Sequence, residues 1–522
     1  MRTFTGEQTQ ILDASMVAEL ALGIVAEDGA ERRVVRTPMS GLQLAEIPLS
    51  STDDVGCAVQ QARAAQRVWS ALGQRRRAAV VLDFHDRLLA ARDEVLDLIQ
   101  LETGKTRANA FEELVEVANV ARHYARAAGT ALAPKRVRGV IPLLGTAVER
   151  RLPRGVIGII TPWNFPFALS LGEAIAALLA GNAVVLRPDP RTSLSVLFGL
   201  RLLLAAGLPP GVLQVVTGDG ETIGDAVAHH TDYISFTGST RVGNQVAVLA
   251  ARRMVGCSLE LGGKNALYVR ADAPLDKAVD IVLRSAFAGA GQVCVHAERL
   301  LLADPIADDF LRRFLPAVRA MRVGVGLDYG YDMGSLFGPD QLRRVEEHVA
   351  DAVRHGATVL TGGRARPDLG PWMYEPTVLD GVTAAMDVRD AETFGPVLSV
   401  YRVSDDEAAV RLVNDSDYGL HATIVSADRE AAARLAPRLR TGSVSINESF
   451  TASWGAAGAT MGARGHSGTG GRHGADGLLK YTVAQSVAEQ RVGSLAAGRT
   501  AQERFAGLFS QGLMVLRRAR VH

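Results

Sequence analysis

The sequence predicts an α/β protein whose core is parallel β-sheet. The main evidence is a regular alternation of short apolar runs, rich in β-branched residues, with amphipathic helical segments after residue 153. Continuous apolar strands that alternate with helices are typical of parallel sheets covered on both faces and joined by right-handed crossovers. The expected strands are 156–160, 183–186, 213–216 and 233–236, and the expected helices are 169–179, 193–206, 221–228 and 239–252.

Length and composition narrow the class of protein. A chain of 522 residues with 48% hydrophobic residues is long enough for more than one domain. Its net charge of +1 gives no basic excess for nucleic acid and no strong field for a membrane surface. Two apolar stretches, 174–186 and 195–208, are interrupted by Asn182 and Arg201, so we expect no membrane span.

The cysteines and the N-terminus indicate the compartment. Cys57, Cys257 and Cys294 are too few and too scattered for a disulfide framework, which favours a reducing environment. The first ten residues, MRTFTGEQTQ, lack the pattern of a signal peptide. We therefore expect a cytoplasmic protein.

The rest of the chain suggests further units. Helical patterns cover 55–72, 75–101 and 108–128, and the second is expected to end at Gly104. Two extended pieces, 137–141 and 146–152, joined near Leu144, predict a projecting hairpin of the kind that serves subunit contacts. A second α/β unit is expected from strands at 299–302 and 357–360 and helices at 306–321 and 339–354. Residues 456–477 are glycine-rich but read as ordered, and the tail is amphipathic around 502–517.

Cys294 and Glu260 are the residues best suited to chemistry. Cys294 follows a run of small residues, 288–291, and Glu260 lies in the glycine-rich stretch Leu259–Lys264. A thiolate nucleophile needs a second group that later activates water, and a glutamate can do this. A dyad of Cys294 with His296 is an alternative, although residues so close in sequence rarely place a base correctly.

The turn 161–166 follows the expected strand 156–160, and ligands in α/β proteins bind beyond the carboxyl ends of strands. The Asn164 amide could donate to a developing oxyanion. The alternative is a rigid turn that packs Trp163 into the core.

Two other turns suggest phosphate binding. Ser239 begins an expected helix directly after Thr237 and Gly238, where free backbone N–H groups favour an anion such as a pyrophosphate. A serine N-cap without any ligand is the alternative. The run from Gly218 to Gly224 misses the dinucleotide fingerprint by one residue, so a plain strand-to-helix connection explains it equally well.

Taken together, these pieces resemble the aldehyde dehydrogenase superfamily over about residues 35–490. The resemblance lies in short stretches that occur in the family's order: 102–105, 162–166, 180–182, 207–209, 236–240, 260–264, 291–294, 392–396, 414–420 and 467–468. It implies a Rossmann-type cofactor domain, an α/β catalytic domain and a β bridging arm used in oligomerisation.

The resemblance also implies roles for individual residues. Cys294 would be the nucleophile, Asn164 and the Cys294 backbone N–H would form the oxyanion hole, and Glu260 would activate the hydrolytic water. Attack on an aldehyde would give a thiohemiacetal, hydride would pass to NADP or NAD, and water would release the free acid. No metal is expected. Ser239 would bind the pyrophosphate and Glu392 the nicotinamide ribose, although Glu392 taken by itself is more typical of a solvated loop residue. The full set of residues implied in cofactor binding is Trp163, Arg187, Asp189, Gly218, Thr237, Gly238, Ser239, Leu261, Glu392 and Phe394.

The family's architecture divides the chain into segments and implies a homodimer or homotetramer. The cofactor domain would comprise 1–133 and 154–260, and the catalytic domain 261–455. The oligomerisation arm would comprise 134–153 and a strand in the return segment 456–490, followed by a tail, 491–522.

More narrowly, the chain resembles the succinate-semialdehyde dehydrogenase branch, in 362–368, 374–379 and 470–482. Succinate semialdehyde is therefore the favoured substrate. A general aliphatic or aromatic aldehyde dehydrogenase is an alternative, and a non-catalytic cofactor-binding or structural protein that retains the fold is an alternative from another class.

Two departures from that branch affect substrate and cofactor. Its basic residues for the substrate carboxylate are replaced by Ala288 and Gly172, and Arg464 is a candidate to compensate. At the adenosine site, Arg187 stands for the usual lysine and Pro190 for the glutamate of NAD-preferring members. The loss of that acid predicts that NADP is used at least as well as NAD.

Overall fold

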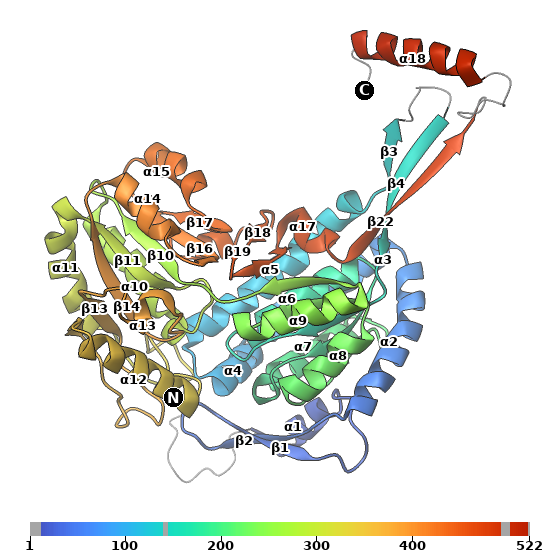
Figure 1. Cartoon of the computed structure of the whole chain (residues 1–522). Coiled ribbons are helices and arrows are strands. Elements are labelled where there is room, and N and C mark those ends of the chain that lie inside the picture. Colours follow the sequence, from blue (N-terminus) through green and yellow to red (C-terminus); the bar gives the residue numbers. More distant parts are fainter. Residues whose placement is uncertain (1–11, 139–144, 492–501, 520–522) are drawn as a thin grey trace.

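The computed structural model describes residues 12–138, 145–491 and 502–519. Two α/β lobes lie side by side, and a narrow antiparallel ribbon projects from one of them (Figure 1). Both lobes are built on mainly parallel sheets, so the expected fold class is confirmed. Within the described ranges, no helix is long and apolar enough to cross a membrane.

The first lobe contains a six-stranded sheet with the order β20-β9-β8-β5-β6-β7. Strands β5 to β9 are mutually parallel, and β20 adds to the edge antiparallel to β9. Every residue of β5, β6 and β8 is buried, which explains their continuous apolar sequences. The strands are β5 (Val156–Ile160), β6 (Ala183–Arg187), β7 (Leu213–Val215), β8 (Tyr233–Thr237), β9 (Gly256–Glu260) and β20 (Gly468–Thr469).

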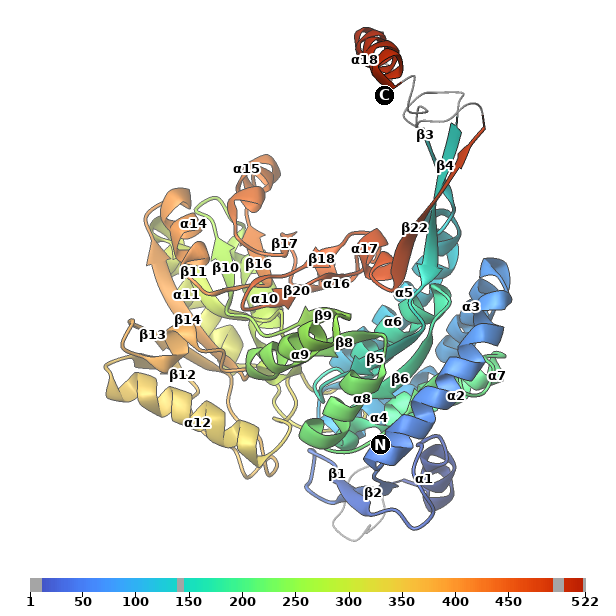
Figure 2. The same ribbon diagram turned by 45° about the vertical axis from the view of Figure 1, so that its right-hand side comes forward.

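Helices surround this sheet in two groups. One group packs α8 against α2 and α9, and the other packs α6 against α5 and α7 (Figure 2). The helices of the lobe are α2 (Thr52–Ala71), α3 (Gln74–Ala90), α4 (Arg92–Thr103), α5 (Arg107–Ala131), α6 (Pro166–Leu179), α7 (Leu194–Ala205), α8 (Asp225–His230) and α9 (Thr240–Arg253). At the N-terminus, α1 (Ala14–Ala21) precedes the hairpin of β1 (Arg32–Arg36) and β2 (Gln43–Pro48).

Two expected helices differ from those observed. The expected helix 75–101 is wrong as one element, because the backbone leaves the helical conformation at Ala91, between α3 and α4. No glycine or proline stands at this kink, so the sequence carried no helix-breaking residue there. The apolar periodicity therefore predicted one continuous helix. The expected helix 221–228 is divided into a π-helical turn, η2 (Gly220–Gly224), and α8. Gly104 ends α4 in the left-handed conformation (φ 74°), as expected.

The second lobe contains a seven-stranded sheet with the order β12-β13-β14-β11-β10-β16-β17. All neighbours are parallel except β12 and β13. The strands are β10 (Asn265–Val269), β11 (Ala297–Ala303), β12 (Thr358–Thr361), β13 (Thr377–Asp380), β14 (Val397–Val403), β16 (His421–Val425) and β17 (Ser443–Ile446). Its helices are α10 (Leu275–Phe287), α11 (Asp304–Arg319), α12 (Pro339–Arg354), α13 (Asp387–Asp390), α14 (Asp406–Asn414) and α15 (Arg429–Leu435).

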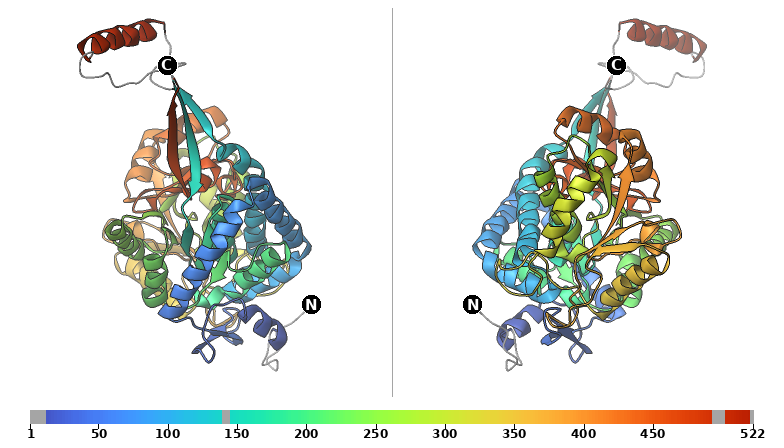
Figure 3. Two further views of the ribbon diagram at one scale, coloured as in Figure 1. Left: turned by 90° about the vertical axis from the view of Figure 1, so that its right-hand side faces the viewer. Right: turned by 90° about the vertical axis from the view of Figure 1, so that its left-hand side faces the viewer.

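The projecting ribbon has three strands, in the order β22-β4-β3. β3 (Lys135–Arg138) and β4 (Gly145–Pro153) form the expected hairpin, whose turn near Leu144 lies outside the described residues. β22 (Thr482–Gln490) pairs along the whole of β4, from Thr482 opposite Pro153 to Gln490 opposite Gly145. Figure 3 shows the ribbon standing clear of both lobes, with α18 (Gln502–Arg518) beyond its tip.

The glycine-rich segment is ordered, as expected, and passes between the lobes (Figure 1). It contributes β20 to the first sheet, and its strand β19 pairs with β15 of the second lobe. Its short elements are α16 (Thr451–Trp454), β18 (Met461–Gly462), β19 (Arg464–Gly465), β21 (Gly471–Arg472) and α17 (Gly474–Leu479), and β15 is Tyr418–Gly419.

A buried ion pair fixes the start of α6. The Glu113 carboxylate accepts a hydrogen bond from Lys105 Nζ (2.6 Å) and two from the N–H groups of Phe167 and Ala168 (3.0 Å each). Lys105 Nζ also donates to the Asn164 carbonyl (2.7 Å). The pair therefore joins α5 to the turn that carries Asn164.

We predict that Glu113→Ala lowers the free energy of unfolding by about 3–5 kcal/mol, because it leaves the buried Lys105 ammonium unpaired. Urea unfolding measures this loss. Glu347→Ala, at an exposed position of α12, serves as the control and should change stability by less than about 0.5 kcal/mol. A loss at Glu113 no larger than that of the control would contradict the prediction.

Candidate active site

Cys294 lies in a tight loop between η3 (Ala288–Gly291) and β11. The loop needs glycine at Gly291, where φ is 71° and a Cβ would lie 2.0 Å from the Gly395 carbonyl oxygen. Two asparagine amides hold it: Asn164 Nδ2 donates to the Gln292 carbonyl (2.9 Å), and Asn265 Nδ2 donates to the Cys294 carbonyl (2.8 Å). The backbone around the thiol is thus fixed from both lobes.

Glu260 is the last residue of β9, and it shares one cleft with Cys294. One Glu260 oxygen, Oε1, is buried and has no hydrogen-bond partner among the described residues. The cleft has a volume of about 220 Å³. Its lining residues are Pro162, Trp163, Asn164, Thr237, Gly238, Ser239, Glu260, Leu261, Gly262, Cys294, Gln341, Arg344, Glu392 and Phe394.

Burial changes the acid–base properties of this pair. It raises the pKa of Glu260 to about 7 and the pKa of the Cys294 thiol to about 12. The positive charge of Arg472 acts in the opposite direction on both groups. A carboxyl with a pKa near neutrality is well suited to proton transfer at physiological pH.

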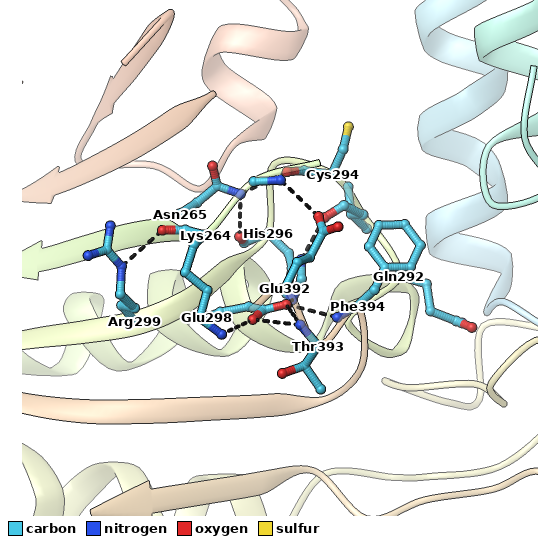
Figure 4. Close-up of polar contacts among 12 residues, drawn as sticks. Lys264, Asn265, Gln292, Cys294, His296, Glu298, Arg299, Glu392, Thr393 and Phe394 are labelled. Atoms are coloured by element: carbon cyan, nitrogen blue, oxygen red, sulfur yellow. Dashed lines mark hydrogen bonds and ion pairs between the residues drawn. The ribbon is translucent and has the colours of Figure 1, made fainter. Parts of the chain in front are cut away.

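His296 does not form a dyad with Cys294. Its Nδ1 contacts the Val293 carbonyl oxygen (2.6 Å), and its Nε2 lies 3.3 Å from Glu298. The imidazole is fully buried on the far side of the loop from the thiol (Figure 4).

The segment that carries Glu392 and Phe394 is held by a buried carboxylate. Glu298 accepts hydrogen bonds from the N–H groups of Thr393 and Phe394 (2.9 Å each) and forms an ion pair with Lys264 (Figure 4). The Glu392 side chain in turn accepts from the Gly263 N–H (2.8 Å). Burial raises the pKa of Glu392 to about 7. Glu392 therefore lies in the cleft and is not the solvated loop residue that it resembles in isolation.

Trp163 and Phe394 form an aromatic wall. Trp163 stacks on Phe337 at 4.3 Å between ring centroids and meets the edge of Phe394 at 5.7 Å. Both residues line the cleft, so the turn 161–166 packs against neighbouring aromatic rings and also faces a cavity.

The opposite wall is the start of α9. Ser239 caps this helix and accepts from the Val242 N–H, and Gly243 lets Leu261 approach, because a Cβ there would lie 2.5 Å from a Leu261 methyl carbon. A second cleft, of about 1140 Å³, lies between η2, α8 and α9. A helix N-terminus between two clefts suits the pyrophosphate of a dinucleotide.

Three residues implied in cofactor binding lie outside the first cleft. Arg187 donates from Nε to the Gly218 carbonyl (3.0 Å), and Asp189 is paired with Arg191 (2.7 Å). Their roles stay predictions. The sequence analysis missed Arg33, which forms an ion pair with Asp219 (3.0 Å) beside the second cleft.

Three residues that support the cleft without lining it were given no role in the sequence analysis. Asn265 and Glu298 carried no signal beyond being polar residues in apolar surroundings, whereas Lys105 lies in the family-like stretch 102–105. Arg464, the candidate compensating cation, is exposed on β19 and is not among the residues that line the cleft, so its role stays a prediction. The described part of the chain contains no cluster of three or more residues suited to a metal ion.

Comparisons with known proteins identify relatives of this chain. A protein of Mycolicibacterium smegmatis, provisionally named succinate-semialdehyde dehydrogenase [NADP(+)], is 44% identical over 465 residues, which cover 89% of this chain and 90% of the relative. The Escherichia coli succinate-semialdehyde dehydrogenase [NADP(+)] GabD is 36% identical. The alignment covers 79% of this chain and 86% of the E. coli protein.

A crystal structure of an NADP-dependent enzyme of E. coli superposes with a TM-score of 0.85 at 33% identity, covering 90% of this chain and 96% of the other. The structure of 3,6-anhydro-L-galactose dehydrogenase in complex with NAP superposes with a TM-score of 0.83, also at 33% identity. The superposition covers 89% of this chain and 97% of the other chain. The model of the aldehyde dehydrogenase family matches residues 24–487. The chain therefore belongs to the aldehyde dehydrogenase family and is an NAD(P)-dependent enzyme that oxidises aldehydes.

Proposed function

We propose that this enzyme oxidises succinate semialdehyde to succinate with NADP and that Cys294 carries the reaction covalently. The observation that carries the chemistry is one cleft in which a buried thiol and a buried carboxyl, Glu260, lie beside the capped start of α9. The substrate and the cofactor are supported by the names of the relatives that are 36–44% identical over most of the chain.

Cys294 forms the covalent bond. The thiol gives its proton to solvent, and the resulting thiolate adds to the aldehyde carbon to form a tetrahedral thiohemiacetal whose oxygen carries the negative charge. Asn164 has two N–H groups on Nδ2, and only one is needed for the bond to Gln292. The second N–H, with the Cys294 backbone N–H, stabilises that oxyanion. Collapse of this species releases hydride and leaves a thioester on Cys294.

Glu260 completes the turnover. As a carboxylate it removes a proton from water, which attacks the thioester carbon and releases the free acid and the Cys294 thiol. The unpartnered Glu260 Oε1 leaves one acceptor available for that water. This geometry disfavours a non-catalytic role, because a binding protein has no use for a buried, unpaired carboxyl beside a thiol.

The first lobe holds the cofactor in this proposal, and the second lobe, residues 261–455, closes the cleft over it. When bound, the oxidised nicotinamide supplies the hydride acceptor. Ser239 and the first turn of α9 bind the pyrophosphate, and Glu392 binds the nicotinamide ribose. Thr237, Gly238, Leu261, Trp163 and Phe394 shape the cleft, while Arg187, Asp189 and Gly218 lie towards the adenosine.

The ribbon β22-β4-β3 is proposed as the contact between subunits of a homodimer or homotetramer. Apolar side chains on it are exposed in the single chain: Val137, Leu152, Val483 and Val487. We also propose a cytoplasmic location, which the three free cysteines support.

The substrate is tested with a panel of aldehydes. We expect a higher kcat/KM for succinate semialdehyde than for butanal, because an anionic substrate gains from a cationic partner that an uncharged one cannot use. Cys294→Ala should abolish oxidation of every aldehyde but still bind the cofactor. Equal or higher kcat/KM with uncharged aldehydes would favour the general aldehyde dehydrogenase.

The cofactor is tested by initial rates at matched concentrations. NADP should support rates at least equal to those with NAD, because position 190 is a proline and offers no carboxylate to repel a 2′-phosphate. Pro190→Glu should lower the ratio of kcat/KM for NADP to that for NAD by about 10-fold, the size of one nearby like-charge contact. Pro190→Gln is the uncharged control. A strong NAD preference of the unmodified enzyme would refute the proposal.

Glu260 is tested by its pH profile. Its raised pKa, about 7, means that the basic carboxylate form accumulates above neutrality, so hydrolytic turnover should rise with pH through about 7. Glu260→Gln should lower kcat by about 10²-fold or more and should remove the rise of turnover with pH. It should still give a burst of reduced cofactor in the first turnover. Glu430→Gln, an exposed site on α15, is the control. Unchanged steady-state turnover would exclude Glu260 as the base.

A further inference from the structure

The last helix of the chain, α18, has no place in the proposed reaction. The match to the aldehyde dehydrogenase family ends at residue 487, so α18 lies beyond the part of the chain that the family shares. It lies crosswise beyond the tip of the ribbon, clear of both lobes (Figure 1, Figure 3). It has no extensive contact with any other element that the structure describes. A partner of α18 is therefore to be sought outside this single chain.

One side of α18 is apolar along its length. Phe509, Leu513 and Leu516 follow one another at intervals of four and three residues, which places them on the same side of a helix. Leu508 and Val515, two turns apart, lie beside them, and these five residues form the apolar face. Leu508 is 72% exposed and Val515 is 62% exposed. Covering this face with an apolar phase is favourable, because it removes apolar surface from water.

Arginines border the apolar face on both sides. Arg504 lies four residues before Leu508, and Arg517 lies four residues after Leu513, so each stands one turn from an apolar neighbour, at opposite edges of the face. Arg518 adds a third positive charge, and α18 contains a single acidic residue. The whole chain has 57 basic and 56 acidic residues, so the positive excess of α18 is local. Arginine stems can lie along an apolar surface while their guanidinium groups reach phosphates.

A lipid bilayer with anionic headgroups matches both features of α18. It offers apolar acyl chains directly beneath negatively charged phosphates. A second copy of α18 would cover the apolar face, but it brings the same three arginines, and like charges would meet. Nucleic acid would match the charges but would leave the apolar face in water. The combination of apolar face and basic borders therefore favours the bilayer.

We propose that α18 attaches the enzyme to the surface of an anionic lipid bilayer. The apolar face lies at the boundary between headgroups and acyl chains, and the bordering arginines contact lipid phosphates. The helix lies on the bilayer and not across it, because its 17 residues extend about 26 Å, less than a hydrocarbon core of about 30 Å. Since α18 stands beyond the ribbon, both lobes stay in water (Figure 3). Attachment of this kind does not depend on which aldehyde the enzyme oxidises.

Vesicle binding by the full-length enzyme tests this attachment. The enzyme should float with vesicles that mix phosphatidylcholine and anionic phosphatidylglycerol, and it should stay in solution with vesicles of phosphatidylcholine alone. High salt should weaken the binding, because ions screen the attraction between arginines and phosphates. Equal binding to neutral and anionic vesicles would contradict the proposal.

Charge variants test the borders of the face. Arg504→Gln combined with Arg517→Gln should lower the partition coefficient onto anionic vesicles by about 20-fold, since one basic residue near an anionic surface contributes about 5-fold. The control removes the same charge from exposed positions of α3, through Arg75→Gln combined with Arg76→Gln. The control should lower the partition coefficient by less than about threefold.

Apolar variants test the face itself. Leu508→Gln combined with Leu516→Gln should lower the partition coefficient by about 10²-fold, because two leucines no longer bury apolar surface in lipid. Ser510→Asn, on the polar side, is the control and should change it by less than about threefold. The fluorescence of Leu516→Trp should shift to shorter wavelength when anionic vesicles are added, and that of Ser510→Trp should not.

Aldehyde oxidation in solution and melting temperature should be the same in all these variants and in the unmodified enzyme, which identifies any variant that does not fold. Failure of the unmodified enzyme to bind anionic vesicles overturns the proposal, and so does equal binding by the α18 variants. A changed oligomeric state of Leu508→Gln with Leu516→Gln in the absence of vesicles also overturns it, because the apolar face would then belong to a contact between subunits.

Discussion

Two asparagine amides hold the loop of Cys294, and the rest of the active site depends on this clamp. Asn164 stands beyond the first sheet and Asn265 begins a strand of the second, and each donates to a carbonyl of the loop. Val293 and Val295, on either side of the thiol, are buried in the hydrophobic core and anchor the loop as well. The hydrogen bonds from both lobes add to this packing, and the thiol can face Glu260 only while the two lobes keep their relative placement.

Buried charge is the second constraint, and it positions groups as well as tuning them. Lys105 with Glu113 fixes the turn of Asn164, and Lys264 with Glu298 fixes the segment of Glu392. Each pair also accepts or donates backbone hydrogen bonds, which offset the desolvation of the ions. Glu260 is buried without such compensation, so its neutral form is favoured and its pKa approaches neutrality.

The sequence was informative where the signal is local. Apolar runs located strands β5 to β8 of the first sheet but not β9 or β20, and Gly104 marked a helix end. The kink at Ala91 carries no glycine or proline and was missed. At the site, motifs named Cys294, Glu260 and Asn164, but their supports, Asn265 and Glu298, contact residues distant in sequence. Arg464 and Arg472 lie in one glycine-rich segment with similar composition, and only the fold shows that the first is exposed and the second buried.

The position of Arg472 explains an otherwise unfavourable pair of residues on α6. A glycine inside a helix costs about 1 kcal/mol relative to alanine, and an ionised glutamate beside it is buried. Gly172 leaves room for the Arg472 guanidinium, and Glu173 anchors its Nε from one side. The other oxygen of Glu173 is paired with Lys480 Nζ (2.9 Å). A cation on a neighbouring segment, held by an acid on the helix, thus lies beside position 172, which the sequence of α6 alone could not show.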